Sequence, residues 1–380
     1  MTKPSRRLRV LMLLDNPTDQ GGAERFALGL AAQLPRDRIE PWVCATRAAT
    51  PEAVEQLEAA AVPLVVLGRR RRADAHRLAG LVSLLRRERF DVIHAHMFGS
   101  NAWGAVLGRL CRLPVVIAHE HNWSFAGSPA RRLVDRHVIA RLATRFVTVS
   151  DAARHRMIEL ERIDPGKIVV LPTAYVPHRV AGAGAGDLRA ELGLGPRARI
   201  VVVAASLRPE KALEVLVAAH DRLARDCADV HLVIAGEGRC RPALERQIAG
   251  LGHGSSVHLL GARHDVGALL GAADVGALSS DWEGMPLFLL ECMTVGVPVT
   301  ATSVGGIPEL VEHDRTGLLV PPRDPAALAG AISALLEDPA RSRRLAAAAA
   351  TRVQDLTIEA VALRFAEFYE CLVAAKRTAL

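Results

Sequence analysis

The sequence predicts an α/β protein with two Rossmann-like domains, each built on a parallel sheet. Short apolar runs alternate with stretches of helical periodicity along most of the chain, which is the pattern of sheets with helices on both faces. The alternation is interrupted at the Gly/Ala-rich segment 181–186 and then starts again. With 380 residues, of which 50% are hydrophobic, the chain is long enough for two separate cores.

The first half predicts strands and helices in regular alternation. We place the strands at 8–14, 41–45, 62–67, 90–94, 114–118 and 146–149. Apolar residues at helical spacing predict helices at 23–34, 52–60, 76–87, 100–111 and 130–143. Together these elements form a first domain, residues 1–180.

The second half repeats this pattern. Apolar runs predict strands at 200–204, 230–235, 257–260, 274–278 and 297–301. Helices are predicted at 187–192, 211–224, 240–251, 264–271, 286–295, 306–313, 325–336, 340–350 and 357–375. We therefore expect a second domain, residues 181–356, followed by a C-terminal helical segment, 357–380.

The composition favours a globular protein of the cytoplasm. No apolar run approaches the ~20 residues of a membrane-spanning helix, and the run Val10–Leu14 is too short for a secretory signal. The cysteines include no C-x-x-C pair, which is typical of reduced thiols rather than of a disulfide framework.

The positive net charge of +7 belongs to the first half of the chain. Residues 1–180 contain 28 basic and 17 acidic side chains, whereas residues 181–380 contain 20 and 24. Basic runs such as Arg69–Arg72 predict either a peripheral contact with an anionic membrane surface, on its inner face, or simply a solvated surface. Because aromatic residues make up only 4% of the chain, we expect no nucleic-acid partner.

Two glutamates that are separated by seven residues, Glu283 and Glu291, frame the most informative segment. The turn Gly284–Pro286 lies between them, and its proline suits the first position of a helix. The amides of Leu287 and Phe288 would then be free donors at a helix start, which attracts phosphate. Glu291 could accept hydrogen bonds from a ribose diol and Glu283 from a sugar hydroxyl. The alternative is a capped core helix with two solvated glutamates.

The run S-S-D-W-E-G-M-P-L-F-L-L-E, which ends at Glu291, resembles the retaining glycosyltransferases of family 4, whose hallmark is E-x7-E. Two further motifs add to the resemblance, G-G-A-E-R from Gly21 and P-E-K ending at Lys211. The resemblance covers nearly the whole chain. It implies the GT-B fold, in which two Rossmann-like domains face a central cleft and the C-terminal helix crosses back to the first domain.

The resemblance also implies donor-binding roles. Lys211 resembles the lysine that neutralises the donor diphosphate. The family usually has an arginine five residues before it; that position is Ser206 here, so Arg208 would have to substitute. The loop Gly21–Gly22 would meet the donor phosphate or the acceptor, and the bare backbone of Gly305–Gly306 would let another loop approach the cleft.

Four histidines form two H-x-H pairs, His94 with His96 and His119 with His121, each at the end of a predicted strand. Residues i and i+2 of a strand share a face, so the geometry permits a zinc site. No third ligand type accompanies the pairs, and buried structural histidines are the commoner case. The resemblance implies that a histidine here contacts the transferred sugar; we choose His121 and hold His119 in reserve.

These assignments predict a glycosyltransferase with Glu283, His121 and Lys211 as its catalytic residues. It would move a sugar from a UDP- or GDP-sugar to a saccharide or lipid-linked acceptor with retention of configuration, in cell-envelope or exopolysaccharide synthesis. No D-x-D triplet occurs in the chain, so we expect no divalent metal, and no other cofactor is implied.

Two other interpretations stay open. Ser206 departs from the family pattern, and so does Thr173–Ala174, where the family commonly has Asn-Gly. These departures suggest a nucleotide-sugar binding protein with impaired catalysis. A GT-B nucleotide-sugar epimerase is the other alternative; it would need acid/base groups beside the sugar ring and no acceptor cleft.

Overall fold

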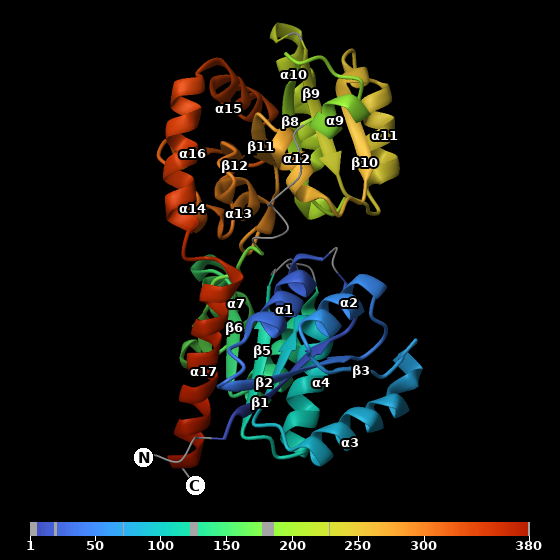
Figure 1. Cartoon of the computed structure of the whole chain (residues 1–380), viewed down its shortest axis with the longest axis vertical. Coiled ribbons are helices and arrows are strands. Elements are labelled where there is room, and N and C mark those ends of the chain that lie inside the picture. Colours follow the sequence, from blue (N-terminus) through green and yellow to red (C-terminus); the bar gives the residue numbers. More distant parts are fainter. Residues whose placement is uncertain are drawn as a thin grey trace. The chain divides into compact units, whose positions relative to one another are not determined.

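The computed structural model describes residues 6–18, 21–70, 72–121, 128–176, 186–227 and 229–378. The chain divides into two compact units, one of residues Met1–Ala174 with Ile358–Leu380 and the other of residues Tyr175–Thr357. Each unit is a parallel sheet covered by helices (Figure 1). The predicted fold class, two Rossmann-like α/β units, is confirmed. The expected boundary at residue 180 falls in 177–185, outside the described residues.

The first unit has a seven-stranded sheet in the order β3-β2-β1-β4-β5-β6-β7. β7 is missing from the sequence prediction, although its residues belong to the apolar run Ile168–Leu171. The strands are β1 (Leu8–Leu14), β2 (Ile39–Ala45), β3 (Leu64–Val66), β4 (Val92–His96), β5 (Val115–Glu120), β6 (Arg145–Thr148) and β7 (Ile168–Val170).

The helices of the first unit cover both faces of this sheet. Because crossovers between parallel strands are right-handed, α1 and α2 lie on one face and α3 and α4 on the other. The predicted helix 130–143 corresponds to the continuous helical stretch 129–142, which contains a π-helical turn, η2. The elements are α1 (Gly22–Gln33), α2 (Pro51–Ala59), η1 (Arg72–Arg77), α3 (Leu78–Glu88), α4 (Met97–Leu110), α5 (Pro129–Val134), η2 (Asp135–Ile139), α6 (Ala140–Leu142), α7 (Asp151–Glu161) and η3 (Pro165–Lys167).

The C-terminal helix α17 (Ile358–Thr378) completes the core of the first unit. It packs against α1, where the rings of Phe26 and Phe365 have centroids 5.8 Å apart. Tyr369 is fully buried, and Glu370 forms an ion pair with Arg38 at 2.5 Å. Among the described residues no helix is long and apolar enough to cross a membrane.

The second unit has a six-stranded parallel sheet in the order β10-β9-β8-β11-β12-β13. Its edge strand β13 is a second strand that is missing from the sequence prediction. The strands are β8 (Arg199–Ala204), β9 (Val230–Ala235), β10 (Val257–Gly261), β11 (Val275–Leu278), β12 (Val299–Thr302) and β13 (Leu318–Val320).

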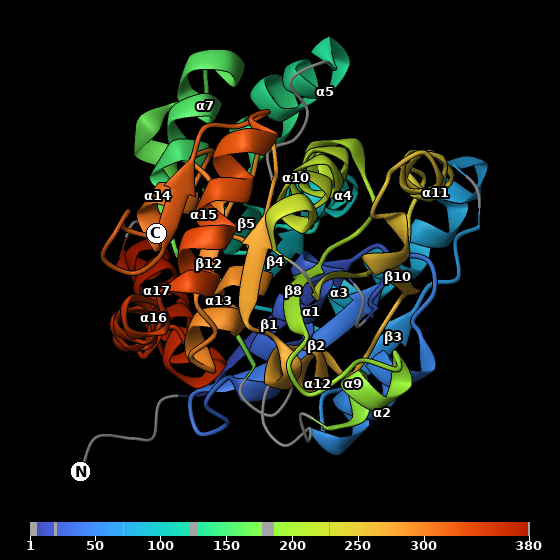
Figure 2. The same ribbon diagram turned by 90° about the horizontal axis from the view of Figure 1, so that it is seen from above.

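Helices also cover both faces of the second sheet. α10 packs against α11 and α15, and α13 packs against α16 (Figure 2). The predicted helix 306–313 is too long, since α14 ends at Leu310. The elements are α9 (Gly186–Glu191), η4 (Pro209–Lys211), α10 (Leu213–Asp226), α11 (Arg241–Ala249), η5 (Gly254–Ser256), α12 (Val266–Ala272), α13 (Leu287–Thr294), α14 (Ile307–Leu310), α15 (Pro325–Glu337) and α16 (Pro339–Val353).

Both sheets reverse their strand order once, between β1 and β4 and between β8 and β11. Ligands of open parallel sheets bind beyond the carboxyl ends of the strands at such a reversal. Gly21 follows β1, and His121 follows β5. In the second unit Lys211 follows β8 and Glu283 follows β11. The fold therefore places these predicted residues at the ligand-binding edge of their own sheet.

Candidate functional site

Lys211 and Glu283 form an ion pair in the second unit. The Nζ atom of Lys211 lies 2.6 Å from Oε1 of Glu283, and Ser280 Oγ donates to the same oxygen at 2.6 Å. The side chains of Lys211 and Glu283 are only 16% and 4% exposed. Two donors therefore hold one carboxylate oxygen of Glu283 in a nearly buried site, and a charged pair of this kind is fixed in geometry.

The backbone around Lys211 is tied to the loop that carries Glu283. Ala212 has a φ of 46°, in the left-handed region that a residue with a Cβ seldom adopts. Ser279 Oγ donates to the carbonyls of Lys211 and Ala212 at 3.1 and 3.0 Å, and the Asp281 amide donates to the carbonyl of Glu210 at 2.9 Å. Such local strain persists where surrounding contacts determine the conformation, as at binding sites.

Gly305 and Gly306 lie directly against the backbone of Glu283. The Gly306 amide donates to the Glu283 carbonyl at 3.0 Å. Gly305 has a φ of +54°, and a Cβ placed on it would stand 1.9 Å from that carbonyl oxygen. A residue without a side chain is required at Gly305, and both glycines hold the backbone of Glu283 in position.

Gly305→Ala is expected to destabilise the second unit and to displace Glu283. The left-handed backbone alone costs roughly 1–2 kcal/mol for a residue with a Cβ, and the contact with the carbonyl adds to it. Gly193→Ala is the matched control, because Gly193 has a φ of +64° and open space around its Cβ position. Thermal unfolding should show a larger loss for Gly305→Ala; equal losses would contradict the close approach.

The helix α13 begins one residue later than predicted. Pro286 has a ψ of 119° and is the N-cap, so Leu287 is the first helical residue. The proline still contributes no N–H, and the amides of Leu287 and Phe288 belong to the first turn, whose N–H groups lack partners within the helix. The Phe288 side chain is buried in the core, so its backbone is the part available to a ligand.

Glu291 and Gly284 accompany this helix start. Glu291 lies on the second turn of α13 and is only 3% exposed. Gly284 is also buried, next to Glu283. Glu283 and Glu291 are both buried. The alternative interpretation of the E-x7-E pair, in which both glutamates are solvated, is therefore wrong.

Arg208 and the glycines of the first unit differ from this group. The Arg208 side chain is 62% exposed and lies 4.0 Å from Glu210. Gly21 is the N-cap of α1, and a Cβ on it would stand 2.0 Å from the carboxylate of Glu24. Glu24 thus lies over the backbone at which a donor phosphate is predicted, with Gly22 exposed beside it.

The two H-x-H pairs form a buried quartet in the first unit. Parallel pairing places His96 opposite His119. His96 Nδ1 lies 3.0 Å from His121 Nε2, and His94 Nε2 lies 3.1 Å from His119 Nδ1. His94 Nδ1 lies 2.7 Å from the hydroxyl of Tyr369 on α17. Sequence reasoning places His121 here but does not find these partners.

Burial keeps the quartet uncharged. Desolvation lowers the pKa of His94 and of His121 to about 3, with a repulsive contribution from His121 on His94. The same cause holds the pKa of His96 and of His119 well below the usual value. Nitrogens of His94, His96 and His119 lie within 4.8 Å of one another, so these three residues could hold a metal ion.

Ser280 and Tyr369 are site residues that the sequence analysis misses. Ser280 stands three residues before Glu283, so this hydrogen bond joins near neighbours along the chain. Tyr369 lies 275 residues from His94 along the chain, and no local pattern connects them.

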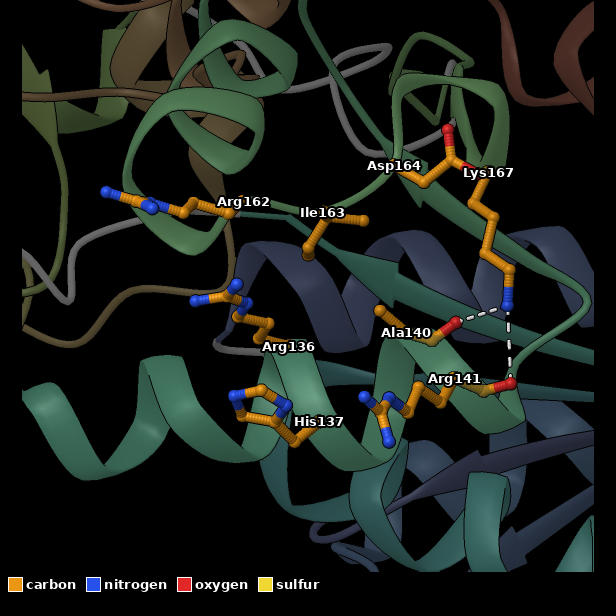
Figure 3. Close-up of a pocket in the computed structure, with 8 residues that line it drawn as sticks. All are labelled: Arg136, His137, Ala140, Arg141, Arg162, Ile163, Asp164 and Lys167. Carbon is orange, nitrogen blue, oxygen red and sulfur yellow. Dashed lines mark hydrogen bonds between the residues drawn. The ribbon is translucent and has the colours of Figure 1, made fainter.

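A pocket of ≈ 240 Å³ lies elsewhere in the first unit (Figure 3). It borders α6, which precedes β6, and η3, which precedes β7. It is therefore at the edge of the sheet opposite His121 and contains no predicted site residue. It is lined by Arg136, His137, Ala140, Arg141, Arg162, Ile163, Asp164 and Lys167.

Known proteins resemble this chain along nearly its whole length. The family model described as Glycosyltransferase Family 4 matches residues 20–179, and the model described as Glycosyl transferases group 1 matches residues 198–338. A D-inositol 3-phosphate glycosyltransferase of Kineococcus radiotolerans is 30% identical over 393 residues, which cover 92% of this chain and 90% of that protein. The chain therefore belongs to glycosyltransferase family 4.

Two further similarities complete the comparison. The UDP-Gal:alpha-D-GlcNAc-diphosphoundecaprenol alpha-1,3-galactosyltransferase of Escherichia coli is 27% identical over 70% of this chain and 71% of that protein. The crystal structure of Anabaena Alr3699/HepE in complex with UDP-glucose matches with a TM-score of 0.86 and 23% identity, covering 96% of this chain and 100% of that one. The fold is GT-B.

Proposed function

We propose that this glycosyltransferase transfers a sugar from a nucleoside-diphosphate sugar, with the donor bound at the edge of the second sheet. The observation that carries this proposal is the buried pair of Lys211 and Glu283, 2.6 Å apart, beside the start of α13. A cation and free helix amides suit a diphosphate, and a carboxylate with an open oxygen suits a sugar hydroxyl.

Each group has a distinct part in the proposed reaction. Negative charge develops on the departing diphosphate oxygen as the anomeric bond breaks, and Lys211 with the amides of Leu287 and Phe288 would stabilise it. Glu283 would orient the donor sugar and Glu291 the ribose. The acceptor hydroxyl would attack on the leaving-group face, giving retention. This fixed positive charge would make a divalent metal unnecessary.

A UDP-sugar is our first candidate for the donor, ahead of a GDP-sugar. Anabaena Alr3699/HepE has been crystallised with UDP-glucose, and the name of the Escherichia coli relative specifies UDP-Gal and a diphosphoundecaprenol-linked acceptor. We infer a saccharide or lipid-linked acceptor and a role in polysaccharide biosynthesis of the cell envelope.

Calorimetric titration with UDP, GDP and ADP in EDTA tests the donor site. We expect one diphosphate to bind in the micromolar range without metal, and Glu291→Gln to weaken it at least tenfold because the diol loses its charged acceptor. Glu337→Gln, an exposed glutamate at the end of α15, is the control. Absence of binding by all three nucleotides would overturn the proposed site.

We also propose that the first unit contacts an anionic membrane. Lys167 donates to the carbonyls of Ala140 and Arg141 at 2.5 and 3.2 Å and so caps α6. Arg136, Arg141 and Arg162 make no ion pair or side-chain hydrogen bond with the described residues. Figure 3 shows Arg136 and Arg162, from different elements, on the same side of the pocket. Unneutralised arginines of this kind suit phosphate headgroups.

Sedimentation with vesicles tests the membrane contact. Replacing Arg136, Arg141 and Arg162 by alanine should weaken binding to phosphatidylglycerol vesicles about 100-fold, at roughly 1 kcal/mol for each charge. The control variant removes three exposed arginines of the second unit, Arg239, Arg343 and Arg344. Equal binding by both variants would show that only net charge matters and would contradict the surface proposed.

A binding protein with impaired catalysis is the second candidate. It is favoured by Ser206, which is exposed in the loop before Lys211, and by the exposure of Arg208. Lys211 therefore lacks the arginine that the family resemblance implies at position 206. Nucleotide binding without transfer to any acceptor would support this candidate.

A further inference from the structure

The histidine quartet consists of two hydrogen-bonded pairs, and each pair contains one fully buried nitrogen that has no hydrogen-bond partner among the described residues. His96 Nδ1 is paired with His121 Nε2, and His119 Nδ1 is paired with His94 Nε2. In both pairs the buried nitrogen that has no partner is an Nε2 atom, that of His96 and that of His119. The hydrogen-bond roles within the quartet therefore depend on which nitrogen carries each proton.

We propose that His96 is a positioning residue that fixes the tautomer of His121. A proton on His96 Nε2 would be a buried N–H without an acceptor, which is rare and costly in proteins. The proton therefore sits on His96 Nδ1 and is donated to His121 Nε2. His121 must then carry its own proton on Nδ1.

The second pair continues the same arrangement. By the same argument the proton of His119 sits on Nδ1 and is donated to His94 Nε2. His94 then carries its proton on Nδ1 and donates it to the Tyr369 hydroxyl at 2.7 Å. Asn101 holds the end of β5 in place, because its side chain exchanges two hydrogen bonds of 3.1 Å with the backbone of His119.

The remaining nitrogen of His121 is the one that can meet a ligand. Its Nδ1 atom has no partner among the described residues, and it does not belong to the fully buried unpartnered atoms. Phe26 of α1 packs edge-on against the ring at 5.4 Å and limits its rotation. His121 thus presents an N–H donor, and not a lone pair, at the carboxyl edge of the first sheet.

This inference rests on the proposed function in one respect, which is the identity of the ligand that accepts a hydrogen bond from His121 Nδ1. A sugar hydroxyl oxygen accepts such a hydrogen bond, and a neutral imidazole N–H binds it without exchanging a proton. His121 would therefore bind a sugar hydroxyl as a neutral donor and would not serve as an acid or a base. The tautomer itself is a property of the free protein.

Nitrogen-15 NMR of the intact, histidine-labelled protein tests the tautomer without any substrate. We expect His121, His96, His119 and His94 in the neutral form with the proton on Nδ1. A proton on Nε2 of His121 would overturn the proposal. Metal analysis of the same sample is a second test, since a stoichiometric ion bound by His94, His96 and His119 would replace these hydrogen bonds and would also overturn it.

Two variants at position 96 connect the tautomer to activity. Asparagine places an amide donor where Nδ1 of His96 lies, whereas leucine removes the donor. We expect His96→Leu to lower kcat about tenfold, which corresponds to one hydrogen bond of about 1.4 kcal/mol, and His96→Asn to recover most of it. Equal loss in both variants, with the NMR pattern of His121 unchanged in His96→Leu, would contradict a positioning role. If no transfer activity is found, the NMR result still decides the tautomer, so the two proposals fail separately.

Discussion

Lys211→Ala is expected to lower kcat by about 100- to 1,000-fold. A fixed donor or cation that faces the developing charge of a leaving group contributes about this factor in enzymes that rely on electrostatic stabilisation. Lys211 lies just before α10, and its backbone is fixed by the left-handed conformation of Ala212 and by a hydrogen bond from the Ser279 hydroxyl to its carbonyl. Steady-state kinetics with the donor found by calorimetry measure the effect.

The same substitution removes the partner of a buried carboxylate. Glu283 would keep the hydrogen bond from Ser280 but lose the cation 2.6 Å away. Breaking one side of a buried pair costs roughly 3–5 kcal/mol, and the 16% exposure of Lys211 favours the lower end. A loss of activity could therefore come from a loss of folded protein, so the design must separate the two.

The double variant Lys211→Met with Glu283→Gln provides that separation. It removes both charges together and leaves no unpaired ion in the site, so thermal unfolding should recover towards the parent protein. Its activity should stay low, because the positive charge is still missing. If the double variant regained activity along with stability, Lys211 would be a structural residue and its proposed part in catalysis would be wrong.

Local sequence patterns predicted those parts of the site that lie on one short segment. The residues Gly284–Pro286 predict a turn and a helix start from local sequence alone. The helix begins one residue later than predicted, but the amides of Leu287 and Phe288 are still in its first turn. The association of Lys211 with Glu283 joins residues 72 positions apart. Local pattern cannot predict such a contact; only the family resemblance placed the two residues in one site.

The parts that sequence reasoning missed depend on tertiary contacts. β7 and β13 are short apolar segments, and their pairing with β6 and β12 makes them strands. The Tyr369 hydroxyl meets His94 only because α17 returns to the first unit. The H-x-H spacing predicted which side chains share a face, but their hydrogen bonds depend on the register between β4 and β5.

Acidification from pH 7 to pH 5 is expected to unfold the first unit well before the second. Each histidine of the quartet is neutral in the folded chain, with the pKa of His94 and of His121 at about 3. In the unfolded chain a histidine takes up a proton near pH 6.5. The unfolded state then binds more protons, so stability is complete above about pH 6.5 and is lost as the pH falls towards 3.

Asp135 of the same unit opposes this trend. Burial, together with the charge of Glu161, raises the pKa of its carboxyl to about 8, so between pH 4 and pH 8 the folded state holds a proton that the unfolded state has lost. Its contribution increases as the pH falls. Four histidines against one carboxyl leave a net excess of three protons where the unfolded histidines are protonated, below about pH 6, or about 4 kcal/mol for each pH unit there.

In the second unit the buried histidine with a strongly lowered pKa is His220, whose pKa burial lowers to about 4. Burial also lowers the pKa of His258, which is only partly buried, and hydrogen bonds to Arg225 and His253 hold the pKa of Asp221 below its usual range. Burial therefore suppresses the protonation of fewer histidines in the second unit than in the first. The two units should separate on acidification into a labile and a resistant part.

Hydrogen exchange read by mass spectrometry between pH 7.5 and pH 5, corrected for the intrinsic pH dependence of exchange, resolves the two units in the intact chain. Peptides from β4, β5 and α17 should lose protection together, because the quartet joins these three elements. Replacing His94 and His119 by leucine lowers the net excess from three protons to one and should reduce the slope to about one third, whereas His137→Gln on the exposed surface should leave it unchanged. Protection that persists in these peptides at pH 5 would mean that an ion or a counter-charge occupies the quartet, which the metal analysis of the same protein would then identify.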